Sequence, residues 1–195
     1  TPSTGGTWTS SNPAVATITN AGAVTAVSAG TASFTFTQTS NGCLSLPSAT
    51  LTVVADPTVS VTGAGITICT GGTVTLGSSI SGGTGATTYI WQNSSNNSTW
   101  TTISVATAAT YTTPVLTANM YYRVSITQVA SGCGSATSGS DLVTVVADPV
   151  VTITGGALTI CEGNTVTLGS TLSGGTGTST YQWQSRTLFK NIIKY

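Results

Sequence analysis

The sequence contains one long segment twice. Residues 54–92 and residues 146–184 align without a gap, with 26 of 39 positions identical, and the offset between them is 146 − 54 = 92 residues. The shared motifs are VADP, TIC, TVTLGS, SGGTG and Y-x-W-Q. A repeat of this length predicts a row of tandem structural units that share one fold.

A chain of 195 residues is too short for three such units. Trp8 plus 92 is Trp100, so the repeat places the back half of a unit before the complete one. We therefore expect four segments: residues 1–55 as the C-terminal half of a module, 56–147 as a complete module, 148–185 as the N-terminal half of a module, and 186–195 as a basic tail outside the repeat. The two broken halves are predicted to be complementary.

The composition is notable for its lack of charge. Charged residues are 4% of the chain, histidine is absent, and four acidic residues balance four basic ones, whereas charged residues are about 25% of an ordinary soluble domain. No apolar run reaches the roughly 20 residues that a membrane-spanning helix needs. Zero net charge disfavours nucleic acid and acidic membranes as partners and removes the repulsion between copies of a protein. We therefore expect self-association.

Strand patterns dominate the chain, and no apolar period of 3.6 residues is present. Short runs of β-branched and aromatic residues recur about every ten residues, separated by Gly, Asn, Ser or Pro. About seven strands in a unit of this size is typical of an immunoglobulin-like sandwich. The predicted fold class is all-β: tandem immunoglobulin-like β-sandwich modules, one complete and two complementary half-modules. In the complete unit the expected strands are Thr58–Thr62, Thr73–Ser78, Tyr89–Gln92, Tyr122–Thr127 and Leu142–Val146.

Side-chain alternation along these strands predicts the core. Trp91 is the expected core plug of the third strand; an exposed platform that stacks on sugars is the alternative, and burial statistics favour the core. Along residues 122–126 alternate side chains face inward, which leaves Arg123 outside. The predicted core residues are Tyr89, Trp91, Tyr122, Val124 and Ile126 in the complete unit, Phe34 and Phe36 in the first half, and Tyr181 and Trp183 in the last.

The sequence lacks patterns of catalytic or metal-binding residues. Without histidine, neither a Ser/His nor a Cys/His nucleophile pair can form. The acids are Asp56, Asp141, Asp148 and Glu162, and the sequence places no two of them as an acid–base pair. One aspartate at each unit boundary is too few for calcium, and the glycine-rich stretch 81–85 lacks the lysine of a phosphate loop and is predicted to be a turn. We expect no enzymatic activity, no cofactor and no metal.

Motifs in the complete unit follow one another in a definite order: Ile68-Cys69-Thr70-Gly71, Val74-Thr75-Leu76, Tyr89-x-Trp91, Trp100-Thr101-Thr102-Ile103, Tyr111-Thr112, Tyr121-Tyr122-Arg123-Val124 and Gly132-Cys133. This order resembles the immunoglobulin-like modules repeated in large secreted proteins and gliding-associated adhesins of Bacteroidetes, which are exported by type IX secretion. The first half-unit is similar to a bacterial immunoglobulin-like domain of group 2, through Trp8-Thr9-Ser10-Ser11-Asn12-Pro13, Val15-Ala16-Thr17-Ile18, Gly22, Val24-Thr25-Ala26 and Ala29-Gly30-Thr31. The resemblance implies an extracellular or cell-surface location and a role as spacer, stalk or adhesive surface.

The four cysteines are Cys43, Cys69, Cys133 and Cys161, and none belongs to a C-x-x-C pair, which favours disulfides over zinc. Cys161 is the repeat partner of Cys69, and Cys43 is the counterpart of Cys133. The resembling modules commonly show both cysteines, which implies a bond between Cys69 and Cys133 within one domain. Sandwich topology places the two loops at opposite ends, which favours a bond between adjacent modules instead. The sequence leaves both rules open.

Two classes of function follow from this organisation. The first is a structural subunit of an extracellular filament, in which the half-module 148–185 of one chain is completed head-to-tail by residues 1–55 of the next, with a disulfide that crosses between chains. The second is a segment of a large surface adhesin whose repeats act as a stalk or bind a glycan or surface. The tail contains Arg186, Lys190 and Lys194, and no role is predicted for it.

Overall fold

The computed structural model describes residues 5–63, 65–128, 133–155 and 158–186. Every regular element in these ranges is a β-strand, which confirms the all-β fold class. The described part of the chain contains no helix that could cross a membrane. Of the basic tail only Arg186 is described, while Lys190 and Lys194 lie outside the described residues.

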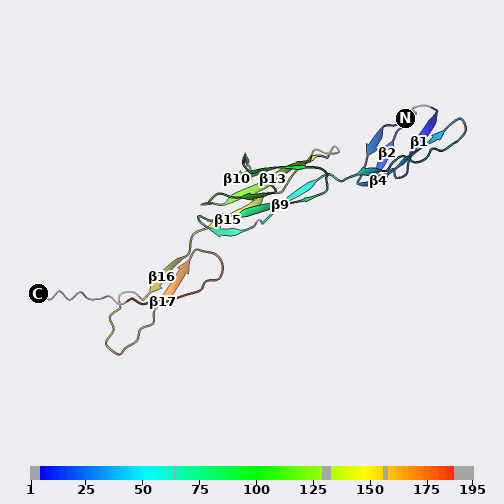
Figure 1. The fold of residues 1–195 in the computed structure, drawn as a ribbon. Helices are drawn as coiled ribbons and strands as arrows, with labels where there is room; N and C mark the ends of the chain where they lie inside the picture. Colours follow the sequence, from blue (N-terminus) through cyan, green and yellow to red (C-terminus); the bar gives the residue numbers. More distant parts are fainter. Residues whose placement is uncertain (1–4, 64, 129–132, 156–157, 187–195) are drawn as a thin grey trace.

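The strands form three groups that follow one another along a line (Figure 1). We call β1–β6 the first half-unit, β7–β15 the central unit, and β16 with β17 the last half-unit. The strands are β1 (Gly6–Ser10), β2 (Ala16–Ile18), β3 (Val24–Ala26), β4 (Gly30–Ala32), β5 (Phe34–Gln38), β6 (Leu51–Val53), β7 (Thr58–Thr62), β8 (Thr67–Cys69), β9 (Thr75–Ser81), β10 (Thr87–Ser94), β11 (Thr101–Thr102), β12 (Thr110–Thr112), β13 (Met120–Gln128), β14 (Ser135–Thr137), β15 (Asp141–Val146), β16 (Val150–Thr154) and β17 (Gly169–Ser173).

The central unit is a sandwich of two sheets. One sheet has the order β12-β9-β7, and the other has the order β11-β10-β13-β15-β8, with β14 also paired to β13. All of these pairs are antiparallel except β15 with β8, which is parallel. This is the immunoglobulin-like sandwich that the spacing of strands and turns predicts.

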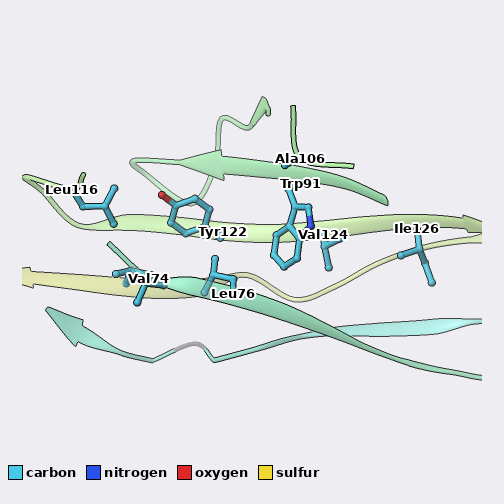
Figure 2. Packing of buried hydrophobic residues seen from close by; sticks show 9 residues of the cluster. Val74, Leu76, Trp91, Ala106, Leu116, Tyr122, Val124 and Ile126 are labelled. Atoms are coloured by element: carbon cyan, nitrogen blue, oxygen red, sulfur yellow. The ribbon is translucent and has the colours of Figure 1, made fainter. Parts of the chain in front are cut away.

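The core of the central unit lies between its two sheets (Figure 2). Trp91 is fully buried, and its indole Nε1 donates a hydrogen bond of 2.9 Å to the carbonyl of Ala108. This bond satisfies the one polar atom of the indole, so the ring contributes its full apolar area to the core. The other buried members of the cluster are Val74, Leu76, Ala106, Leu116, Tyr122, Val124, Ile126 and Val143.

The glycine-rich stretch between β9 and β10 is a turn, as predicted. Gly82 and Gly83 both have positive φ, at 74° and 67°. A Cβ on Gly82 would lie 2.6 Å from the carbonyl oxygen of Asp56, so a side chain there would collide with the start of β7. Gly174 has the same surroundings, because a Cβ on it would lie 2.5 Å from the carbonyl oxygen of Asp148. The turn therefore docks on the Asp-Pro boundary in both units.

The last half-unit repeats the first hairpin of the central unit. β7 pairs with β9 from Thr58 opposite Ser81, and β16 pairs with β17 from Val150 opposite Ser173, so the two registers are identical after the offset of 92 residues. The third predicted strand of this half-unit is not formed, since residues 174–186 carry no strand.

The first half-unit has a small core of its own. β1 pairs with β5, β2 with β3, and β4 with β6, all antiparallel. The buried residues are Val15, Ala16, Ala32 and Phe34, and Trp8, Ile18, Leu51 and Val53 pack around them.

Candidate interface on the two half-units

The structure places the predicted core residues in different environments. In the central unit Trp91, Tyr122, Val124 and Ile126 are buried, and Tyr89 is half-buried against the same cluster. Phe34 is buried in the first half-unit and Phe36 is half-buried.

Tyr181 and Trp183 require a correction. They are 58% and 53% exposed, so neither is a core residue within this chain. The reason is that the strand which would hold them is not formed, and no described strand of the same half-unit faces them.

β1 occupies the position in the first half-unit that β10 occupies in the central unit. β4 and β5 together span residues 30–38, and β13 spans residues 120–128, so the offset between them is 90. β10 pairs with β13 by placing Tyr89 opposite Ile126, and β1 pairs with β5 by placing Trp8 opposite Phe36, which is the repeat-equivalent pair. Trp8 is thus the structural counterpart of Tyr89.

The sequence alignment of Trp8 with Trp100 is therefore wrong in structural terms. Trp100 lies outside the core, where the guanidinium carbon of Arg123 sits 4.2 Å from the centre of its ring. The Nε of Arg123 also donates a 2.7 Å hydrogen bond to Oε1 of Gln92. Trp8 instead packs against Phe36 with ring centroids 5.1 Å apart and ring planes tilted by 58°. β1 of the first half-unit already occupies the position that β10 has in the central unit. A complete module needs only one strand in that position, so the two half-units overlap by one strand.

The last half-unit presents an apolar face that is open. Val166 is 45% and Leu168 is 46% exposed, while their repeat-equivalents Val74 and Leu76 are 7% and 0% exposed. In the central unit β9 pairs with both β7 and β12, whereas β17 pairs with β16 alone among the described strands. The other large apolar residues exposed in this half-unit are Val150, Val151, Ile153, Leu158, Ile160 and Leu172.

A cleft of about 660 Å³ lies at the junction of the first half-unit and the central unit. In the described part of the chain β3 pairs only with β2, and β6 pairs only with β4, so one edge of each strand is open. In the central unit the corresponding edge of β15 is covered by β8. The lining residues are Val24, Ala26, Val27, Ser28, Ala29, Leu51, Thr52, Val53, Val54, Ala55, Asp56 and Cys133.

The structure holds Cys69 and Cys133 at opposite ends of the central unit. Cys69 ends β8 and lies opposite Val146, the last residue of β15. Cys133 precedes β14 and lines the cleft, and the neighbouring Gly134 N–H lies 3.5 Å from Oδ1 of Asp56. β13 spans the distance between these ends, and its nine residues extend about 25 Å. Bridged Cα atoms must approach within about 7 Å, so the fold keeps this pair apart.

All four cysteines are free thiols in the structure. Cys43 and Cys161 are exposed, and Cys69 and Cys133 are half-buried. The disulfides expected from the sequence thus remain a prediction.

The phenol of Tyr122 is the most perturbed titratable group described. Burial raises the pKa of Tyr122 to about 12, and the neighbouring Tyr111 phenol adds to the rise. Burial also raises the pKa of Tyr111. The Tyr122 hydroxyl has no hydrogen-bond partner among the described residues, so the core holds it as a neutral, apolar-contacting group.

In the comparison with known proteins, different family models match the central unit and the first half-unit. A family model for a domain of unknown function (DUF8696) matches residues 58–147, and the model of the bacterial Ig-like domain (group 2) matches residues 1–46. The chain is built of immunoglobulin-like repeats. Among curated proteins none matches it.

Solved structures with similar immunoglobulin-like repeats are distant. The N-terminal four Ig domains of Dscam1 isoform 6.9 are 12% identical with a TM-score of 0.39, and the match covers 67% of this chain and 32% of that one. Murine CEACAM1b is 15% identical with a TM-score of 0.33, covering 67% and 68%. Domains 4 and 5 of the S-layer protein SbsC are 21% identical with a TM-score of 0.29, covering 73% and 71%. The chain thus spans about a third of the length of the first of these structures.

The cleft was not predicted from the sequence. The constant offset of 92 predicts Trp100 as the counterpart of Trp8, whereas Trp8 and Tyr89 are 81 residues apart. Trp8 precedes Phe36 by 28 residues and Tyr89 precedes Ile126 by 37, and this difference of nine residues hides the correct alignment in the sequence.

Proposed function

We propose that the protein is a non-catalytic structural subunit of an extracellular filament, assembled head-to-tail. The open face of the last half-unit of one copy docks in the cleft of the first half-unit of the next. One observation carries the proposal. The repeat-equivalents of the open face and of the cleft pack against each other inside the single sandwich of the central unit.

The central unit supplies the template for the docked state. There Leu76 of β9 is fully buried and lies opposite Tyr111 of β12. In the docked state residues 167–169, the repeat-equivalents of the β9 residues that pair with β12, lie against the open edge of β3 in the next copy. Leu168 then takes the position of Leu76, and burial of a leucine side chain contributes about 1.5–3 kcal/mol. Several such residues on β16 and β17 are available for the same contact.

The position of β1 determines which strands form the composite sandwich. The composite sandwich contains β16 and β17 from one copy and β1 to β6 from the next, with β1 as its third strand. Residues 179–184, which hold Tyr181 and Trp183, have no position in it, because β1 already covers the edge of β5. The two half-units are complementary without that segment.

The geometry of the contact determines the form of the assembly. The first and last half-units lie at opposite ends of the central unit (Figure 1), and the cleft on one differs from the open face on the other. A contact between two different surfaces is heterologous, and repeated head-to-tail it propagates as an open filament unless the rotation closes a ring.

Two further features support a role outside the cell. The chain is rich in Thr, Ser, Asn and Gly and poor in charged residues. The disulfides that we propose between units require an oxidising compartment. The motif order that resembles secreted Bacteroidetes modules gives type IX secretion as the route of export. Immunoglobulin-like repeats of this kind serve mainly as spacers, stalks and adhesive surfaces.

Light scattering and negative-stain electron microscopy of the 195-residue chain, kept reduced with a thiol, test the proposal. We expect polymers whose mean length grows with protein concentration and which consist of beads in a single row. A chain that stays monomeric at all concentrations contradicts the filament and supports the alternative of an adhesin segment that needs no partner copy.

A further inference from the structure

We infer that two disulfides seal each junction of the filament, one between Cys161 of one copy and Cys133 of the next, and one between Cys69 and Cys43 of the same two copies. This inference rests on the proposed function, because it places the cysteines with the docked half-units. Besides receiving the open face of the last half-unit, the cleft then binds one specific segment, the segment that carries Cys161.

The first step is the register of β8. In the central unit β8 runs parallel to β15, with Thr67 opposite Thr144 and Cys69 opposite Val146. Val54 is the repeat-equivalent of Val146, and Cys161 is that of Cys69, each by the offset of 92. A docked copy therefore places residues 159–161 along the open edge of β6, with Cys161 opposite Val54.

The second step is the chemistry of the segment and the cleft. Leu158 and Ile160 are 52% and 50% exposed, whereas their repeat-equivalents Ile66 and Ile68 pack on the central core. The cleft offers Leu51 and Val53 to receive them. Residues 159–161 carry no strand in this chain, whereas their repeat-equivalents form β8, so docking supplies the neighbour on which the segment forms a strand. Its two apolar side chains match the apolar lining of the cleft.

The third step is the position of Cys133. It lines the same cleft as Val54, and the adjacent Gly134 is held near Asp56 by the 3.5 Å contact to its carboxylate. Val54 and Asp56 are two residues apart, which is at most about 7 Å of extended chain. Docking therefore brings Cys161 to the end of the cleft where Cys133 lies, and the inferred bond requires their Cα atoms to approach within about 7 Å there.

The other end of the same junction follows from the repeat. Cys43 is the counterpart of Cys133, and its carbonyl accepts from the N–H of Gln38, the last residue of β5. It thus lies at the outer end of the first half-unit. In the filament that end meets the far end of the preceding central unit, where Cys69 stands beside Val146. Each junction therefore joins Cys69 to Cys43 and Cys161 to Cys133.

The bonds form by oxidation of two thiols to one disulfide, with loss of two protons and two electrons. A small-molecule disulfide accepts these electrons by thiol–disulfide exchange and is released as two thiols. Oxidised glutathione is a sufficient oxidant for the test.

The experiment mixes equal amounts of unlabelled and ¹⁵N-labelled full-length chain under reduction, oxidises the mixture with oxidised glutathione, and maps disulfide-linked peptides by mass spectrometry. We expect the pairs 161–133 and 69–43, with about half of each in the mixed light–heavy form. Cys161→Ser should abolish the first pair and leave the second, and Cys43→Ser should do the reverse.

A Cys69–Cys133 peptide, or linked peptides that are never of mixed isotope, overturns the inference. The assembly state in reducing buffer separates this failure from failure of the proposed function. Polymers that form under reduction but yield other pairs reject the pairing alone. A chain that neither polymerises nor forms mixed-isotope disulfides rejects both.

Discussion

Trp8 lies directly opposite Phe36 in the pairing of β1 with β5, and the two rings pack with centroids 5.1 Å apart and planes tilted by 58°. Through this pair β1 covers the edge of β5 in the first half-unit. In the proposed filament the pair therefore determines which aromatic residues take part in docking.

The contrast between two tryptophans tests that consequence. Trp183→Ala should leave the concentration dependence of assembly unchanged within about twofold, because residues 179–184 have no place in the composite sandwich. Trp8→Ala should destabilise the first half-unit by about 2–4 kcal/mol, since it removes a large side chain packed on the small core. Thermal unfolding and light scattering of both variants measure this. Loss of assembly in Trp183→Ala alone would show that residues 179–184 displace β1.

The core of the central unit depends on Trp91. Trp91→Ala should lower the free energy of unfolding of that unit by about 3–5 kcal/mol, because it leaves a cavity and removes the partner of the Ala108 carbonyl. Denaturant unfolding followed by circular dichroism is the measurement. Trp100→Ala is the matched control and should cost less than about 1 kcal/mol, since its ring contacts Arg123 at the surface. Equal losses of unfolding free energy in Trp91→Ala and Trp100→Ala would argue against Trp91 as the central residue of the core.

Much of this architecture could be predicted from the sequence, and the reasons are local. The run Thr58–Thr62 forms β7 with the predicted bounds, because β-branched residues alternate with small polar ones between turn signals. β8 was missed because Thr67–Cys69 is too short to show a period and exists only through its parallel pairing to β15. The cleft could not be predicted, because no motif marks it and it lies beside edges of β3 and β6 that no described strand covers.

Alkaline pH should weaken the central unit through Tyr122. The folded pKa of about 12 lies above the ordinary value of 10.0, so the neutral phenol is favoured by folding. The stability is then fully present below about pH 10 and falls between pH 10 and pH 12, by about 2–3 kcal/mol in total. Tyr122→Phe should remove most of this fall and be at least as stable at neutral pH, because the hydroxyl it deletes has no partner among the described residues. Unfolding curves at both pH values measure the difference. An identical alkaline decline in Tyr122→Phe would assign the effect to another group.

Salt should have little effect on assembly. The chain carries four acidic and four basic residues, and the cleft and the open face are lined mainly by apolar and small residues. Screening acts on charges alone. The polymerisation midpoint, measured by sedimentation in reducing buffer, should rise less than about twofold between roughly 0.05 M and 1 M sodium chloride. Dissociation by salt would mean that ion pairs hold the junction.

Docking of two different surfaces of the same chain is tested most directly by a pair of complementary variants. Leu168→Asp places an unpaired carboxylate on the open face of the last half-unit, and Val24→Asp places one on β3 in the cleft. Burying such a charge costs several kcal/mol. Thr167→Asp and Thr25→Asp are the matched controls, because Thr25 does not line the cleft and Thr75, the repeat-equivalent of Thr167, is exposed.

The measurement is analytical ultracentrifugation of each variant alone and of their equimolar mixture in reducing buffer. We expect each variant alone to be a monomer of 19.4 kDa, and both controls to polymerise. The mixture retains one intact face and one intact cleft, so it should form a dimer of twice that mass and nothing longer. A mixture that stays monomeric, or single variants that still polymerise, would contradict head-to-tail docking of the two half-units.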